Sequence, residues 1–311
     1  MAAAAWSRCI AAFIRLSRLP FLAGGFVFHG LGAAMAGYAG APLDLAVFAW
    51  GQVAITTAQL MTHYANEYFD LAADRANPTP TRWSGGSRVL PAGELAPGVA
   101  LAMALIMGLV ALGATAALAW GLRAGPLASP LLLLSIALAW SYSGPPLRLQ
   151  ARGLGGIVAA LVVPGLTPLV GFTLQAGAIS RLPLLSALPL CGLQFAMLLI
   201  IDIPDAAGDA AADKRTPAVR LGARAVAWLH NLTLLTTYAA LPLLALAGMP
   251  PLAAGAAALG APLALWQAWR VRRGDWAKPA KWDGLAFGSV ALLIGTSVAE
   301  LVTFVLMHSL V

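Results

Sequence analysis

Long apolar segments separated by short polar connections constrain the fold of this chain more than any other feature. Nine such segments can be drawn, each bounded by charged residues, glycine or proline. They cover residues 19–39, 45–68, 97–120, 127–142, 154–174, 184–203, 224–247, 251–270 and 284–308. A membrane-spanning helix needs about 20 predominantly apolar residues. The pattern therefore predicts an all-α polytopic membrane protein with nine transmembrane helices in one bundle.

Composition excludes a soluble protein. Of the 311 residues, 60% are hydrophobic and 10% are charged, whereas soluble domains average about 45–50% apolar and about 25% charged residues. A membrane β-barrel would need strands of alternating polarity, which are absent from the sequence. No connection between the segments is long enough to fold separately. We therefore expect one transmembrane domain over residues 1–311, with the lipid bilayer as its surroundings.

The basic residues predict the orientation of the bundle. With the N-terminus in the cytoplasm, all but two of the 19 Lys and Arg residues fall in cytoplasmic segments, the exceptions being Arg123 and Arg181. Residues 1–19 are expected to form an interfacial helix on that side. We interpret the chain as an integral protein of a bacterial plasma (inner) membrane. The net charge of +7 is dispersed over the connections, so we expect no nucleic-acid partner.

Two acidic motifs follow apolar segments on the predicted cytoplasmic side. In the first motif, Asn66, Asp70 and Asp74 are spaced four residues apart, which places them on one face of a helix. The second motif contains Asp202, Asp205, Asp209 and Asp213. With Glu67, which follows Asn66 in the first motif, the two motifs hold seven of the 12 acidic residues of the chain. Because acidic residues are costly near hydrocarbon, this concentration predicts a functional site.

Basic residues accompany both motifs within the same connections. Arg88 follows the first motif, and Lys214 and Arg215 follow the second. Carboxylate and amide oxygens suit Mg²⁺, and interleaved basic residues suit a metal–diphosphate complex. The apolar interior of a bundle would accept a long hydrocarbon tail. The combination predicts Mg²⁺ as the cofactor and a polyprenyl diphosphate as the substrate, with no obligate protein partner.

The chemistry expected of such a site is ionisation of an allylic C–O bond. Mg²⁺ and basic residues would stabilise the departing diphosphate, and π faces would stabilise the carbocation. Tyr142, at the cytoplasmic end of the fourth segment, is the candidate for that second role, with Tyr68 and Phe69 as alternatives. If a base is needed, the candidates are Asp74 and Asp202.

Five sequence motifs resemble those of the UbiA superfamily of intramembrane aromatic prenyltransferases. They lie at residues 66–74, 85–93, 142–148, 205–209 and 213–222, and the resemblance extends over nearly the whole chain. It implies a nine-helix fold and two Mg²⁺ ions with the diphosphate between them. The implied metal ligands are Asn66, Asp70 and Asp74 for one ion and Asp205 and Asp209 for the other.

The expected chemistry and the resemblance together assign further roles. The predicted catalytic residues are Asp70, Asp74, Asp202, Asp205, Asp209 and Tyr142, and the predicted substrate-binding residues are Asn66, Tyr68, Arg88, Lys214 and Arg215. The Gly-Gly-Ser-Arg and Lys-Arg-Thr forms are most similar to 1,4-dihydroxy-2-naphthoate prenyltransferases of menaquinone synthesis. That similarity implies loss of the acceptor carboxylate during transfer, with Arg88 as its candidate partner.

The sequence departs from the family pattern at two positions and leaves alternatives open. Glu67 stands where many members carry Asp, and Asp213 stands where Gly is common. Other acceptors would be 4-hydroxybenzoate, homogentisate, a chlorophyllide or a glyceryl phosphate lipid. The alternative of another class is an ion-coupled transporter, which would place its acids near the membrane midplane. Glu300, inside the last apolar segment, has no assigned role.

Overall fold

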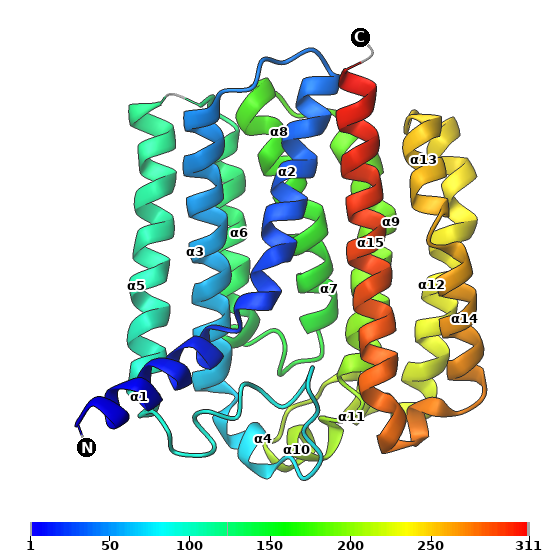
Figure 1. Ribbon diagram of the computed structural model, residues 1–311. Coiled ribbons are helices and arrows are strands. Elements are labelled where there is room, and N and C mark those ends of the chain that lie inside the picture. The colour runs from blue at the N-terminus through cyan, green and yellow to red at the C-terminus, as the bar shows by residue number, and fades with distance from the viewer. Residues whose placement is uncertain (1, 123, 310–311) are drawn as a thin grey trace.

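The computed structural model describes residues 2–122 and 124–309, and every regular element in these ranges is helical. Figure 1 shows upright helices side by side, with both acidic motifs at one end of the bundle and the C-terminus at the other. Arg123, one of the two basic residues predicted on the outer side, lies outside the described residues.

The elements follow one another in a simple order. The first half comprises α1 (Ala2–Ser17), η1 (Leu19–Leu22), α2 (Ala23–Tyr38), α3 (Leu45–Phe69), α4 (Leu71–Ala76), α5 (Pro97–Ala116), η2 (Ala117–Gly121), α6 (Ala128–Ser143), α7 (Gly155–Ala160), η3 (Leu161–Leu166) and α8 (Thr167–Ala176). The second half comprises α9 (Arg181–Ile201), α10 (Ala206–Ala211), α11 (Pro217–Leu221), α12 (Ala223–Leu246), α13 (Pro251–Ala258), α14 (Ala261–Arg272), η4 (Asp275–Ala277), η5 (Pro279–Lys281) and α15 (Trp282–His308).

Eight helical segments of the described chain are long and apolar enough to cross a membrane, which confirms a polytopic helical protein. They are Trp6–Tyr38, Leu45–Phe69, Pro97–Gly121, Gly155–Ala176, Arg181–Ile201, Ala223–Leu246, Pro251–Arg272 and Pro279–His308. The fourth predicted segment forms α6, which has 16 residues. At 1.5 Å per residue it is about 24 Å long, short of a hydrocarbon core of about 30 Å. The count of nine spans therefore stays a prediction.

The N-terminal helix α1 runs obliquely across the motif end of the bundle (Figure 1). Its exposed side carries Trp6, Ile10 and Ile14, whereas Ala12 and Leu16 are buried in a cluster with residues of α3. The chain then leaves the helix at Arg18, whose φ of 51° is left-handed. This turn directs the chain upward into α2 and leaves Arg18 at the base of the bundle.

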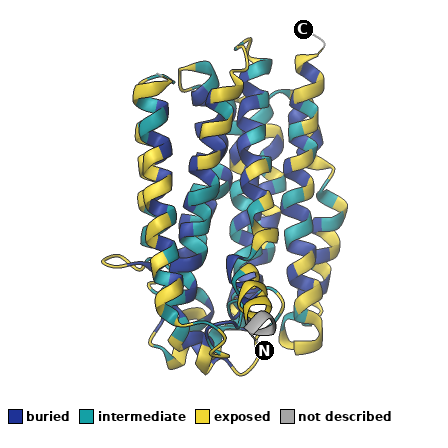
Figure 2. Ribbon diagram, turned by 60° about the vertical axis from the view of Figure 1, so that its left-hand side comes forward, coloured by how far each residue is buried: buried dark blue, intermediate teal, exposed yellow. Residues whose placement is uncertain are grey.

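The exterior of the bundle is apolar along its length. Figure 2 shows exposed residues on the outward faces of the helices and buried residues along their inward faces. Exposed large side chains include Leu109 on α5, Leu235 on α12 and Phe287 on α15. A soluble protein rarely exposes so much contiguous apolar surface. Hydrocarbon around the bundle accounts for this pattern.

Proline interrupts a helix beside the centre of the bundle. Between α7 and α8 the chain widens into the π-helical segment η3, which contains Pro164. Proline has no N–H to donate and its ring crowds the preceding turn, so the regular helix cannot continue there. The neighbouring residues Val162 and Val163 line the central cavity described below.

Candidate active site

The first acidic motif lies where α3 passes into α4. The Asp70 N–H donates to the Asn66 carbonyl at 2.9 Å, and the Asp74 N–H donates to the Asp70 carbonyl at 2.9 Å. The helical course therefore continues through the motif although Asp70 caps α3. Asn66, Asp70 and Asp74 all line one central cavity.

The second motif begins at the end of α9 and continues into α10. Asp202 caps α9, Asp205 precedes α10 and Asp209 lies within it. Helix α10 packs closely against α4 because Gly208 has no side chain. A Cβ at Gly208 would lie 2.6 Å from the Ala73 carbonyl oxygen. The small residue thereby brings the two motifs face to face.

Lys214 joins the two motifs electrostatically. Its ammonium nitrogen lies 3.2 Å from Asp70 Oδ2 and 2.8 Å from Asp209 Oδ1, and its side chain is 5% exposed. Burial opposes the charge of Lys214, but the two carboxylates raise its pKa above the ordinary value. A left-handed turn at Asp213, with φ of 56°, returns the chain toward the motifs just before Lys214.

The Gly-Gly-Ser loop closes one side of the site. The Gly85 N–H donates to Asp205 Oδ2 at 3.1 Å, and Ser87 donates from its N–H and its hydroxyl to the two oxygens of Glu67, each at 2.7 Å. Between them Gly86 adopts a φ of 69° and passes so close to Asp74 that a Cβ would overlap the carboxylate. Glycine is therefore required at residue 86.

The acids of the site are crowded and buried. Burial, followed by the Asp70 and Glu67 charges, raises the pKa of Asp74 to about 7. Burial and the charges of Asp205 and Asp209 raise the pKa of Asp202 to about 8. Burial also raises the pKa of Asp205 to about 6. This mutual repulsion favours a bound cation, which would relieve it.

The residues present fit a magnesium-dependent site. Among the described residues, no three His, Cys, Asp or Glu side chains form a ready-made metal cluster. Lys214 instead supplies the positive charge between one acid of each motif. The Asn66 amide nitrogen donates to Asp70 and Ser143, which leaves its carbonyl oxygen available. Carboxylate and amide oxygens are the hard ligands that Mg²⁺ prefers.

The motifs open into a cavity of about 430 Å³, within the range of small-molecule sites. Its polar lining includes Arg18, Asn66, Asp70, Asp74, Tyr142, Asp202, Asp205, Asp209 and Lys214. Its apolar lining includes Ala54, Ile55, Ala58, Leu132, Ile136 and Val170. One chamber therefore combines an acidic and basic end with an apolar interior that can hold hydrocarbon.

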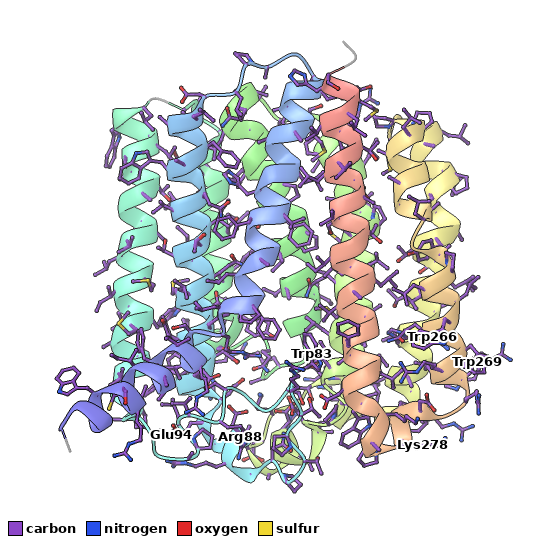
Figure 3. The ribbon with its side chains drawn as sticks, in the orientation of Figure 1. Trp83, Arg88, Glu94, Trp266, Trp269 and Lys278 are labelled. Carbon is purple, nitrogen blue, oxygen red and sulfur yellow. The ribbon has the colours of Figure 1, made fainter. Side chains whose placement is uncertain are left out.

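Three predicted substrate-binding residues lie outside this lining. The Arg88 guanidinium donates to the Asp74 carbonyl oxygen, and Figure 3 shows Arg88 among the loops at the motif end. Tyr68 packs against Phe69 and faces an outer groove. The Arg215 N–H donates to the Ala151 carbonyl oxygen at 2.7 Å. In this structure the Arg88 side chain binds the backbone of the first motif outside the cavity.

Sequence reasoning missed several polar residues that line the cavity, among them Asn77, Ser84 and Arg18. Asn77 donates to Asp205 Oδ1 at 2.7 Å, and Ser84 hydrogen-bonds Asp205. Arg18 reaches the cavity from the end of α1. Asn77 and Ser84 flank the recognised motifs and could have been suspected. Arg18 resembled the other membrane-edge arginines, so its sequence position gave no signal.

The comparisons with known proteins identify a family and a shared fold. The UbiA prenyltransferase family matches residues 26–304. A UbiA homologue from Archaeoglobus fulgidus bound to GPP and Mg²⁺ superposes with a TM-score of 0.64 at 14% identity, covering 93% of this chain and 99% of that one.

Two further solved structures share the fold. A digeranylgeranylglyceryl phosphate synthase has a TM-score of 0.65 at 13% identity, covering 96% of this chain and 99% of its own. The apo UbiA homologue from Aeropyrum pernix K1 has a TM-score of 0.64 at 16% identity, covering 89% of this chain and 96% of its own. No curated protein matches the chain in sequence. Identities this low show the fold alone.

Proposed function

The chain belongs to the UbiA prenyltransferase family, and from that premise we propose that it transfers a polyprenyl group from polyprenyl diphosphate to 1,4-dihydroxy-2-naphthoate with Mg²⁺ as cofactor. Family membership makes the protein a prenyltransferase and sets the ion-coupled transporter aside. The observation that carries the proposal is the position of Lys214 between Asp70 and Asp209, at the polar end of a largely apolar cavity.

The polar end suits a diphosphate. Mg²⁺ held by Asn66, Asp70 and Asp74 on one side and by Asp205 and Asp209 on the other would neutralise the phosphate oxygens and promote their departure. Lys214 adds an ammonium with three donors, two of which already point at carboxylates. Its remaining donor can stabilise charge that develops on the leaving group. Homologues from Archaeoglobus fulgidus bound to DMAPP or GPP with Mg²⁺ support this substrate class.

The proposed reaction balances without a further reagent. The allylic C–O bond breaks, and its electron pair leaves with diphosphate. A ring carbon of the acceptor bonds to the allylic carbon and loses its proton. The carbon that carried the carboxylate releases CO₂ and takes up one proton in exchange. Tyr142 lines the cavity where its ring can face the allylic cation, and the apolar lining excludes water from that cation.

The acceptor is the more specific part of the proposal. It rests on the Gly-Gly-Ser-Arg and Lys-Arg-Thr forms that begin at Gly85 and Lys214. A glyceryl phosphate lipid is a second candidate, since a digeranylgeranylglyceryl phosphate synthase shares the fold. The other acceptors are 4-hydroxybenzoate, homogentisate and a chlorophyllide.

A transfer assay tests the function. The purified protein in nanodiscs receives radiolabelled geranylgeranyl diphosphate, Mg²⁺ and each acceptor, beside the variants Asp70→Asn and Asp205→Asn. Asp44→Asn is the control, because Asp44 caps α3 at the opposite end and asparagine also caps helices. We expect Mg²⁺-dependent prenylation of 1,4-dihydroxy-2-naphthoate, lost in the two site variants and kept in the control. Transfer only to another acceptor would overturn the acceptor and keep the site.

We also propose that the motif end faces the cytoplasm of a bacterial plasma membrane, as the basic connections predict. A single cysteine introduced at Glu94, with Cys9 and Cys191 replaced by serine, tests this orientation. Glu94 is a partly exposed residue in the loop that precedes α5. An impermeant maleimide should label it in inside-out vesicles and leave it unlabelled in right-side-out vesicles. The reverse pattern would invert the topology.

A further inference from the structure

Arg18 and Lys214 both line the cavity, and the Arg18 guanidinium makes few polar contacts. Lys214 is held by two carboxylates. The Arg18 guanidinium makes one ion pair among the described residues, at 4.0 Å to Glu67 Oε1, and its side chain is 20% exposed. Glu67 already accepts two hydrogen bonds of 2.7 Å from Ser87. Arg18 therefore has donors left for a ligand.

One aromatic ring packs against this guanidinium, and two further rings pack against that ring. The Arg18 Cζ lies 4.8 Å from the centre of the Phe21 ring. Phe21 in turn meets His63 and Trp83 edge to face, with ring centres 6.4 Å and 6.0 Å apart. All four side chains line the central cavity, and Figure 3 shows Trp83 toward the motif end of the bundle. A planar cationic fork beside three rings is suited to a flat molecule that carries an acid group.

The position of this pocket relative to the acidic motif matches a two-substrate reaction. His63 precedes Asn66 by three residues on α3, and both line the cavity. Side chains three residues apart on a helix lie about 5–6 Å from each other at Cβ. A molecule held at Arg18 would therefore extend its ring toward the first motif. Bond formation needs the reacting carbons to approach to about 3–3.5 Å, which this adjacency allows.

We propose that Arg18 binds the carboxylate of the aromatic acceptor and that Phe21, His63 and Trp83 hold its ring. The proposal rests on the prenyltransferase function given above and deepens it, because it names the group that selects the acceptor. It also replaces Arg88 in that role, since the Arg88 guanidinium is engaged by the Asp74 carbonyl oxygen and lies outside the cavity lining. A guanidinium pairs with a carboxylate through two parallel hydrogen bonds.

A comparison of two acceptors tests this assignment. The variant Arg18→Gln is assayed with 1,4-dihydroxy-2-naphthoate and with 1,4-dihydroxynaphthalene, which lacks the carboxylate. Loss of a charge-assisted pair should raise KM for the acid about 10- to 100-fold. KM for 1,4-dihydroxynaphthalene and KM for the prenyl diphosphate should stay within about twofold. Arg18→Lys, which keeps the charge and loses the fork, should recover part of the loss.

Arg15→Gln is the matched control. Arg15 lies one turn earlier on α1, where it pairs with Glu94 outside the cavity, so its loss should leave all three KM values unchanged. A rise in KM for the prenyl diphosphate in Arg18→Gln would place Arg18 on the diphosphate and overturn the assignment. An equal loss for both acceptors would show a structural role and overturn it as well.

Failure of the proposed acceptor is distinguishable from failure of this assignment. If the wild-type protein prenylates 4-hydroxybenzoate instead, the same variants are compared on 4-hydroxybenzoate and phenol, with the same split expected. If no acceptor is prenylated, the assignment of Arg18 is tested by measuring the binding of 1,4-dihydroxy-2-naphthoate by calorimetry. Binding weakened by Arg18→Gln and kept by Arg15→Gln would support Arg18, whereas binding that is absent or equal in both variants would overturn the assignment.

Discussion

The ammonium nitrogen of Lys214 lies 3.2 Å from a carboxylate oxygen of Asp70, although the two residues belong to different motifs. A second carboxylate, on Asp209, lies 2.8 Å from the same nitrogen. Removing one member of such a buried group destabilises the fold strongly, because the remaining charges are left buried without a partner. This contact makes Lys214 the link on which the geometry of the site depends.

Lys214→Gln should therefore reduce both stability and turnover. Leaving two buried carboxylates without their cation should cost about 3–5 kcal/mol in the absence of metal. Loss of one donor at a developing charge should lower the single-turnover rate about 100- to 1,000-fold. Thermal unfolding in EDTA and rapid-quench transfer assays measure the two effects. Lys278→Gln, at a half-exposed lysine outside the cavity, should change neither. Normal turnover in Lys214→Gln would remove this residue from the leaving-group role.

Gly86→Ala should damage the site through one added methyl group. The new Cβ would overlap the Asp74 carboxylate, and the φ of 69° would be strained as well. Gly93→Ala separates these effects, because Gly93 has a φ of 71° and no atoms within 4 Å of its Cβ position. Both variants should lose about 1 kcal/mol of stability from backbone strain. Only Gly86→Ala should lose transfer activity, by tenfold or more, in the same assay. Equal activities would mean that the loop tolerates the displacement.

Much of the fold is predictable because the bilayer imposes a simple rule on the sequence. Apolar segments such as 45–68 and 224–247 correspond to α3 and α12 with nearly the same bounds. Hydropathy is less informative where a span is short or interrupted. Helix α6 has only 16 residues, and the segment at 251–270 is divided into α13 and α14. The predicted segment 127–142 is equally short, so its length was visible in the sequence, whereas hydropathy did not reveal the division into α13 and α14.

The candidate site likewise has a part that the sequence predicts and a part that it does not. The acidic residues were predictable because carboxylates beside hydrocarbon are costly and their four-residue spacing reports a helical face. The placement of the arginines was not predictable in this way. Arg88 and Arg18 are both membrane-edge arginines in the sequence, and only tertiary contacts distinguish them. Arg88 donates to a backbone carbonyl oxygen, whereas Arg18, itself in a left-handed conformation, lines the cavity.

Glu67→Gln should disturb the loop and leave the response to Mg²⁺ intact. Both carboxylate oxygens of Glu67 accept hydrogen bonds from Ser87. A glutamine can still accept from the Ser87 N–H and can donate its NH₂ group to the Ser87 hydroxyl, so both contacts remain possible but lose their charge assistance, at a cost of about 1–2 kcal/mol. Chemical unfolding measures that cost, and a Mg²⁺ titration of activity measures the metal response. Asp70→Asn is the comparison, because it removes a predicted ligand. A weaker apparent Mg²⁺ affinity in Glu67→Gln, equal to that in Asp70→Asn, would make Glu67 a ligand.

The metal-free protein should lose stability as the pH rises, and Mg²⁺ should restore it most at high pH. The pKa of Asp74 is raised to about 7, so the folded state retains a proton that the unfolded state, with a pKa near 3.8, has already released. Between these values the folded state binds more protons, so the free energy of unfolding falls with rising pH. Mg²⁺ competes with those protons and binds more tightly as they leave. Melting temperatures in EDTA and in Mg²⁺ from pH 5.5 to 8.5 test this, and Asp74→Asn should flatten the fall in EDTA. A Mg²⁺-induced rise that is the same at pH 6 and pH 8.5 would contradict it.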